Sequence, residues 1–311
     1  MADRELRGVS PIYESLCRAV AASPAICALV ADLPPAKWQP NLLLGVVRLV
    51  GGPIHRPADF LDFVRANWTG ISASMLSHST QTNEPGRCAV LLPLLSQLRG
   101  PLALIEVGAS AGLCLFPDRY RYRYRTVTGE NHCLGIGPVE LACDVDGPVP
   151  LPDQLPDVRW RAGLDLHPLR ADSDIDRDWL RALIWPEHRD RLNRLSAALD
   201  IVAADPPRID TADVIDGLPA LIDAAPSDCT VVVFHSAVLA YLNLDDRSRF
   251  TDLMDELHHS SGVQWISNEG AGVVRGADVI DGSDGRFVLT NNHQPVALTA
   301  PHGQTLTWLA H

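Results

Sequence analysis

The stretch that decides the fold is PLALIEVGASAGLCLF, residues 101–116. An apolar run ends in Glu106, and Gly108, Ser110 and Gly112 follow at alternate positions. Such a run is typical of a buried parallel strand, and the small residues let a ligand approach the backbone of the turn. The stretch predicts a strand and then a turn that opens a helix, at the sheet edge where α/β proteins bind ligands.

The chain on either side of this stretch predicts the rest of the sheet. Three further apolar runs end in polar residues: VRWRAGLDL (158–166), CTVVVFHS (229–236) and GVQWISNE (262–269). Helical periodicity fills 186–205, behind Pro186 of the WPEH motif, and 245–262, and the final RFVLT (286–290) and QTLTWL (304–309) resemble a closing antiparallel pair. Strands that alternate with helices predict an α/β protein with a doubly wound, mainly parallel sheet.

The chain divides into two predicted domains. Residues 1–100 contain short helices punctuated by Pro and Gly, with Ser10 and Ser23 as N-caps, and form an N-terminal helical cap. Residues 101–311 form a Rossmann-type domain that is interrupted by a β insertion at about 117–157. In RYRYRYR (119–125) the tyrosines share one face of a strand and the arginines the other. The basic face either holds an anionic substrate or is a solvated surface.

Composition excludes several classes of protein. The net charge of −12 argues against a general nucleic-acid binder, since affinity for nucleic acids depends on neutralising phosphates. Seven scattered cysteines without a C-x-x-C pattern favour a reducing compartment and disfavour both a disulfide framework and a zinc site. No signal peptide and no apolar run of membrane-spanning length is apparent. We therefore expect a cytoplasmic protein with no bound metal and no membrane partner.

The turn after Glu106 selects among three nucleotide ligands. A P-loop needs a Lys after its last glycine, which is missing here, and Ser110 interrupts the G-x-G-x-x-G dinucleotide pattern. Glu106 would also repel a pyrophosphate. S-adenosylmethionine has no phosphate and carries an ammonium and a sulfonium, so a carboxylate beside the turn attracts it. A tight turn without any ligand is the alternative.

Further acids follow later apolar runs. Asp165 ends the run at 158–166, where an acid accepts hydrogen bonds from ribose hydroxyls. A further short run, in RIDTADVID (208–216), predicts the third strand and ends near Asp213, at a place for the adenine amino group. Asp144, at the end of VELACD, is the rival ribose ligand because the interval between Gly112 and Asp165 is long. Acids at three strand ends strengthen the prediction of S-adenosylmethionine.

Residues 101–311 resemble a class I S-adenosylmethionine-dependent methyltransferase. The whole chain more closely resembles an uncharacterised bacterial domain-of-unknown-function family, on QTNEPGR, EVGASAGL, DRYRY, WPEH, VVFHSAVLAYL and SNEG. The resemblance implies a methyltransferase-like cofactor site and no established substrate. By position it implies that the turn residues Glu106, Gly108, Ser110 and Gly112 hold the cofactor, with Asp165 at the ribose and Asp213 at the adenine.

The remaining candidate residues lie in three motifs. If the helix predicted at 85–98 runs antiparallel to the first strand, Asn83, Glu84 and Arg87 return to the turn. Arg87 then pairs with the cofactor carboxylate; alternatively, Asn83 and Glu84 only cap the helix. His235 and Ser236 end the fourth strand, with Tyr241 one turn later in the core or pocket wall, and Asn268 and Glu269 end the fifth.

His235 is the candidate general base, because the pKa of a free imidazole lies near neutrality, and the alternative is a histidine held by hydrogen bonds. Glu269 is the second candidate catalytic residue, and Asn83, Glu84, Tyr241 and Asn268 are candidate substrate contacts. We expect a transferase that uses S-adenosylmethionine on a small molecule, most simply a methyltransferase. A catalytically silent cofactor-binding or interaction module is the alternative, and an NAD(P)-dependent oxidoreductase is disfavoured by Glu106 and Ser110.

Overall fold

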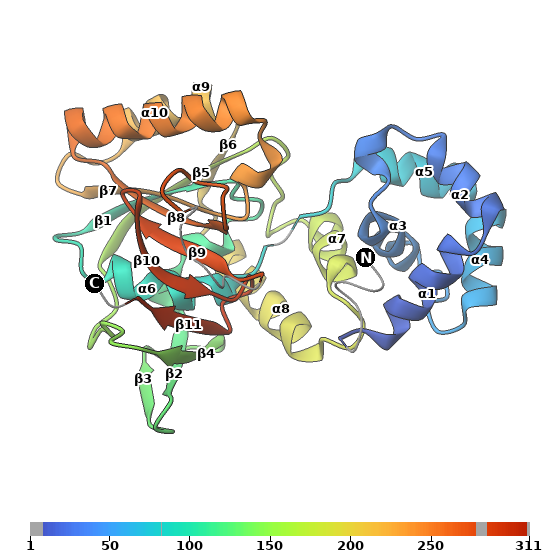
Figure 1. Ribbon diagram of the computed structural model, residues 1–311, viewed down its shortest axis with the longest axis horizontal. Coiled ribbons are helices and arrows are strands. Elements are labelled where there is room, and N and C mark those ends of the chain that lie inside the picture. Colours follow the sequence, from blue (N-terminus) through green and yellow to red (C-terminus); the bar gives the residue numbers. More distant parts are fainter. Residues whose placement is uncertain (1–8, 82, 278–284, 310–311) are drawn as a thin grey trace. The chain divides into compact units, whose positions relative to one another are not determined.

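The computed structural model, shown in Figure 1, describes residues 9–81, 83–277 and 285–309. The chain divides into a helical unit, Met1–Thr82 with Ser173–Ser196, and a sheet unit, Asn83–Asp172 with Ala197–His311. This division differs from the boundary expected near residue 100. The segment 83–100 joins the sheet unit because its helix packs on the sheet, and the later segment 173–196 returns to the helical unit.

Short helices build the helical unit, and the first four of them begin at a proline, in the region where the sequence predicts short helices. Ser10 and Ser23 accept hydrogen bonds from the N–H groups of Tyr13 and Ile26, which confirms both N-caps. Phe60 and Val64 lie fully buried in its core. The helices are α1 (Pro11–Ala21), α2 (Pro24–Ala31), α3 (Pro40–Leu49), α4 (Pro57–Ala66), α5 (Trp68–Ser77) and α7 (Asp174–Leu183), with a 3₁₀ turn η2 (Pro35–Lys37).

Within the described residues, no single helix combines the length and hydropathy needed to cross a membrane. The pair α1 and α2 reaches that threshold only when both helices are counted together, and it is bent by 86° at the break.

The sheet unit has a mixed α/β fold around a large, mostly parallel sheet. Its described strands follow the order β3-β2-β4-β11-β10-β9-β8-β7-β1-β5-β6. The four runs predicted as parallel strands are confirmed as neighbours: β1 (Leu102–Val107), β5 (Val158–Asp165), β7 (Thr230–Ser236) and β8 (Gln264–Gly270), and β6 (Arg208–Thr211) extends them beyond β5. β1 is buried along its whole length, as are most of β7 and β8 and most of the later half of β5, which explains their apolar runs.

Helices cover the two faces of this parallel core. In Figure 1, α9 (Val214–Ala224) and α10 (Leu244–Ser261) lie side by side along one face, and their apolar side chains pack with Ile105, Val107 and Trp265. Gly262 ends α10 in the left-handed conformation. The 3₁₀ turn η3 (Pro85–Arg87) leads into α6 (Cys88–Leu95), so the helix expected over 85–98 is shorter. α8 (Arg189–Ala204) contains the boundary between the two units.

The β insertion confirms the alternation of tyrosine and arginine. In β2 (Arg121–Thr126), Tyr122 and Tyr124 are fully buried, and so is the preceding Tyr120. β2 lies between β3 (Asn131–Leu134) and β4 (Glu140–Asp146), and β4 pairs with the C-terminal β11. The insertion therefore continues the main sheet.

Two expectations about connecting elements are wrong. The turn after β1 does not open an α-helix: two 3₁₀ turns follow, η4 (Leu113–Leu115) and η5 (Pro117–Arg119), since Pro117 disfavours the helical conformation of the residue before it. The last strands, β9 (Phe287–Asn291) and β11 (Thr305–Trp308), do not pair with each other, because β10 (Gln294–Thr299) lies between them and is antiparallel to both.

Candidate functional site

The candidate site lies at the carboxyl ends of β1 and β7. After β1 and the β insertion, the chain forms β5 and β6 on one side of β1, and then crosses to β7 and β8 on the other. Such a reversal of strand order is where open α/β sheets bind ligands. The loops after β1 and β7 each contain a non-glycine residue with positive φ, Ser110 at 51° and Ala237 at 59°. Residues in this conformation cluster at functional sites because their strain must be held by the surrounding structure.

Side chains from outside the turn hold the turn after β1. The Asn83 amide donates to the carbonyl of Ala109 at 2.9 Å and accepts from the N–H of Leu113 at 3.3 Å. Asp165 accepts from the N–H groups of Ser110 at 2.7 Å and His167 at 2.8 Å. The structure thus brings Asn83 and Asp165 to the turn, as the sequence predicts, and gives both of them backbone partners.

Glu106 supplies a second carboxyl to the site, at the end of β1. It is buried, and burial raises its pKa well above the ordinary value; the Cys114 thiol adds to this rise, whereas the Arg87 guanidinium opposes it. Within the described parts of the chain, Oε2 of Glu106 is buried without a hydrogen-bond partner. A buried carboxylate oxygen without a donor is costly, so this atom is a candidate contact for a cationic ligand group.

Arg87 crosses from η3 to the end of β7. Its Nη1 donates to the carbonyl of Ser236 at 2.8 Å, and its Nε donates to that of Pro301 at 3.1 Å. The Asn268 amide donates to the Ser236 hydroxyl at 2.9 Å and accepts from Thr299 at 2.7 Å. The neighbouring Glu84 is buried and accepts from the N–H of Gly86, which makes it the cap of η3. Thr82 of the QTNEPGR motif lies outside the described residues.

The two candidate catalytic residues lie on the other face of the sheet. Residues paired across parallel strands share a face, so Glu106 lies on the face of Phe234 and Ser236. His235 and Glu269 project from the opposite face, toward α10. Of the candidate residues, Glu106 and Ser236 thus share one face of the sheet, whereas His235 and Glu269 lie on the other.

Hydrogen bonds occupy both ring nitrogens of His235. Its Nε2 accepts from the indole N–H of Trp265 at 3.0 Å, so the ring proton is on Nδ1, which donates to Oε1 of Glu269 at 2.7 Å. The imidazole is fully buried. His235 in this arrangement has no free lone pair with which to take a substrate proton, and the geometry matches the alternative of a hydrogen-bonded histidine.

Close packing explains the glycines of the turn. A Cβ on Gly108 would lie 2.5 Å from a methyl of Val238, and one on Gly112 would lie 2.9 Å from Pro207. Gly163 of β5, which the sequence analysis missed, is equally constrained, because its Cβ would lie 2.5 Å from that of Ala109. Spacing along the chain gave no signal for Gly163, since its neighbour Ala109 lies in the turn after β1, far away in the sequence.

Three other candidates lie in ordinary structural settings. Asp213 caps α9 by accepting from the N–H of Ile215. Asp144 forms an ion pair with Arg125, and five strands separate β4 from β1, which leaves Asp165 as the acid beside the turn. Tyr241 lies in η6 (Leu239–Tyr241) and is 78% exposed, which excludes the core, one of the two places expected for it.

The arginines of β2 also have acidic partners, which favours the solvated surface over an anion site. Arg121 and Arg123 pair with Glu140 of β4. Among the residues that the structure describes, no group of three or more His, Cys, Asp or Glu side chains could hold a metal ion.

Comparisons with known proteins place the chain in a family. No curated protein matches it, and no solved structure matches it. A family model described as "Uncharacterized protein conserved in bacteria (DUF2332)" matches residues 1–308. Since this match covers almost the whole chain, the protein belongs to the DUF2332 family.

Proposed function

We propose that this protein is a transferase that binds S-adenosylmethionine at the turn after β1 and acts on a small molecule. The observation that carries the proposal is the buried Oε2 of Glu106, which has no hydrogen-bond donor among the described residues and lies where the strand order reverses. An ammonium group of a ligand would supply the missing donor and favour the charged carboxylate.

The surrounding residues fit the other parts of this cofactor. Asp165 uses one lone pair of each oxygen for Ser110 and His167, so each oxygen can still accept from a ribose hydroxyl. Arg87 offers a cation for the cofactor carboxylate. The turn is followed by 3₁₀ turns and not by an α-helix, so it lacks the helix N-terminus that commonly binds a phosphate.

The bound cofactor would supply a sulfonium-activated carbon for in-line attack by an acceptor atom. The role of the chain is then to orient the two reactants, and positioning alone accounts for large accelerations. Methyl transfer is the simplest reaction, and transfer of another carbon substituent of the sulfonium uses the same site.

A cofactor-binding protein without turnover is the second candidate function. The hydrogen bonding of His235 favours it, because both nitrogens are occupied and the ring lies on the face opposite Glu106. Saturable binding of the cofactor without any product from a panel of small-molecule acceptors would support this candidate.

Calorimetry with S-adenosylhomocysteine tests the binding site. We expect saturable binding by the wild type, and roughly 10- to 100-fold weaker binding by Glu106→Gln, the range for loss of a charge-assisted hydrogen bond. Because the pKa of Glu106 is raised in the free protein, binding of the ammonium should release protons, seen as a heat that depends on the ionisation enthalpy of the buffer.

Asp144→Asn is the matched control, since it removes an acid from an exposed ion pair away from the turn. It should bind like the wild type. Equal affinity for Glu106→Gln, or the same proton release from that variant, would remove Glu106 from the site. An absence of binding by the wild type would overturn the proposed cofactor.

A further inference from the structure

The loop after β7 covers the glycine turn after β1. Val238 lies against Gly108 so closely that two of its methyl carbons would be 2.5 and 3.0 Å from a Cβ at that position. Position 108 therefore requires glycine, because any Cβ there would clash with Val238 in this arrangement. The same contact fills the space in front of the turn, where a ligand of the turn would need to approach the backbone.

Glu269 holds the N–H groups of this loop. Its Oε1 accepts from Val238 at 2.8 Å and from Leu239 at 3.1 Å, in addition to His235 at 2.7 Å. The bond from Trp265 to His235 orients the imidazole that donates to Glu269. A single buried carboxylate oxygen thus accepts hydrogen bonds from two backbone N–H groups of the loop and from the imidazole of His235.

Arg247 of α10 holds the carbonyl groups of the same loop. Its Nε donates to Leu239 at 2.8 Å and to Leu242 at 3.1 Å, and its Nη2 donates to Ala240 at 2.9 Å. The Glu269 carboxylate therefore binds backbone N–H groups of the loop, and the Arg247 guanidinium binds its carbonyl groups. Leu239 is bound by both side chains.

Besides these two side chains, the loop is held by a hydrogen bond from the N–H of Ala237 to the carbonyl of Asn268 and by partial packing of Val238 and Leu242 on the core. Of residues 237–242, only Leu239 is buried, and Tyr241 exposes most of its side chain. Ala237 has a positive φ of 59°, which costs free energy in a residue with a Cβ. Segments with few buried contacts open at lower free energy than the core, so loss of either charged side chain should shift this loop toward its open state.

We propose that Glu269 and Arg247 are positioning residues that clamp residues 237–242 over the turn, and that a small-molecule ligand must displace Val238 to reach Gly108. The ligand in this statement rests on the proposed function, whereas the clamp does not. Release of the clamp raises the fraction of molecules whose turn is accessible, and the apparent affinity rises by the same factor.

Arg247→Ala tests the clamp in the full-length protein, with Arg249→Ala as the control. Arg249 lies on the same helix and forms an exposed ion pair with Asp246. We expect Arg247→Ala to speed amide hydrogen exchange of residues 238–242 by about tenfold and to tighten binding of S-adenosylhomocysteine by about the same factor. Arg249→Ala should change neither quantity. Val238→Ala should tighten binding without faster exchange, because it opens the turn and keeps the clamp.

Amide exchange and ligand affinity together show which part of the proposal fails. Unchanged exchange in Arg247→Ala overturns the clamp whatever the ligand does. Faster exchange with weaker binding shows that the loop closes onto the ligand, and overturns the displacement of Val238. Faster exchange in a series in which neither the wild type nor any variant binds the ligand supports the clamp and overturns the proposed cofactor.

Discussion

At the scale of single residues, two acids on one face of the sheet have opposite environments. Asp165 accepts two backbone N–H groups, and Oε2 of Glu106 is buried without a described donor. A carboxylate that accepts backbone hydrogen bonds stabilises a turn. A buried carboxylate without such partners destabilises the folded state, and groups of this kind are typical of sites that bind a ligand. The sequence identified both acids, and only the backbone geometry distinguishes their roles.

Glu106→Gln should stabilise the protein at neutral pH. The pKa of Glu106 is raised in the folded state, so between the ordinary value of 4.5 and the raised value the folded protein holds a proton that the unfolded chain releases. The free energy of unfolding therefore falls as the pH rises through this window, by about 1.4 kcal/mol for each unit of difference between the two pKa values. The neutral amide lacks this penalty.

Urea denaturation at several pH values measures this effect. The gain in stability should be largest at neutral pH and should shrink as the pH falls toward 4.5. Glu140→Gln, which removes the partly exposed ion pairs with Arg121 and Arg123, serves as the control, because each such pair contributes about 1 kcal/mol or less. Lower stability of Glu106→Gln at neutral pH would mean that the carboxylate has a stabilising partner in the folded protein.

At the scale of elements, periodicity predicted the parts of the fold that each element determines by itself. Continuous apolar runs predicted β1, β5, β7 and β8, and alternation predicted the buried tyrosine face of β2. The position of β10 between β9 and β11 depends on pairing between distant segments, which local patterns do not encode. For the same reason, the sequence did not reveal that Arg247 and Glu269 hold one loop.

Tyr124→Phe tests the attachment of the β insertion. The Tyr124 hydroxyl donates to the carbonyl of Ala89 in α6 at 2.8 Å and is fully buried. Its removal leaves a buried carbonyl without this donor, so we expect a loss of about 1–2 kcal/mol in the free energy of unfolding by urea. Val127→Ala, at a position that is 77% exposed, should change it little. A loss below about 0.5 kcal/mol for Tyr124→Phe would show that another donor or water replaces the hydroxyl.

At the scale of the whole molecule, the helical unit is assembled from two distant parts of the chain. Residues 173–196 return to the N-terminal helices: the Trp179 indole donates to the carbonyl of Ser79, and Arg48 donates to that of Ala182.

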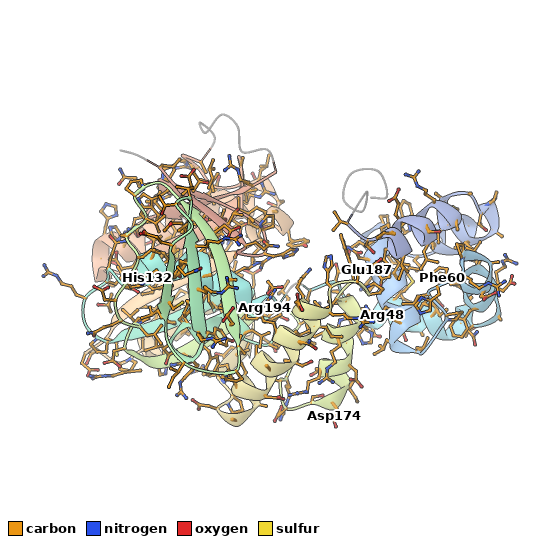
Figure 2. The ribbon with its side chains drawn as sticks, turned by 90° about the horizontal axis from the view of Figure 1, so that it is seen from below. Arg48, Phe60, His132, Asp174, Glu187 and Arg194 are labelled. Carbon is orange, nitrogen blue, oxygen red and sulfur yellow. The ribbon has the colours of Figure 1, made fainter. Side chains whose placement is uncertain are left out.

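Glu187 of the WPEH motif accepts from the Ser10 hydroxyl at 2.8 Å and from the N–H of Ile12 at 2.9 Å, so it binds the first turn of α1. Figure 2 shows Arg48 and Glu187 in this helical unit. Pro186 explained only the break between helices, and the partner of Glu187 could not be predicted from a motif 175 residues away.

Glu187→Gln should weaken α1 and leave the sheet unit unchanged. Burial alone would raise the pKa of Glu187, yet the hydrogen bonds from Ile12 and Ser10 lower it below the ordinary value of 4.5. A lowered pKa in the folded state stabilises the protein above pH 4.5, and this contribution is lost as the pH falls through the folded value. The hydrogen bonds from Ser10 and Ile12 to the carboxylate are worth about 1 kcal/mol, so amide exchange in residues 11–21 should rise about fivefold at neutral pH, and the excess over wild type should diminish in acid. Glu14→Gln, which removes an exposed pair with Arg18 on the same helix, is the control and should change exchange less than twofold.

Because the helical unit and the sheet unit have separate cores, exchange in β1 and β7 should stay at the wild-type rate. Equal acceleration in those strands would show that the two units unfold as one cooperative structure.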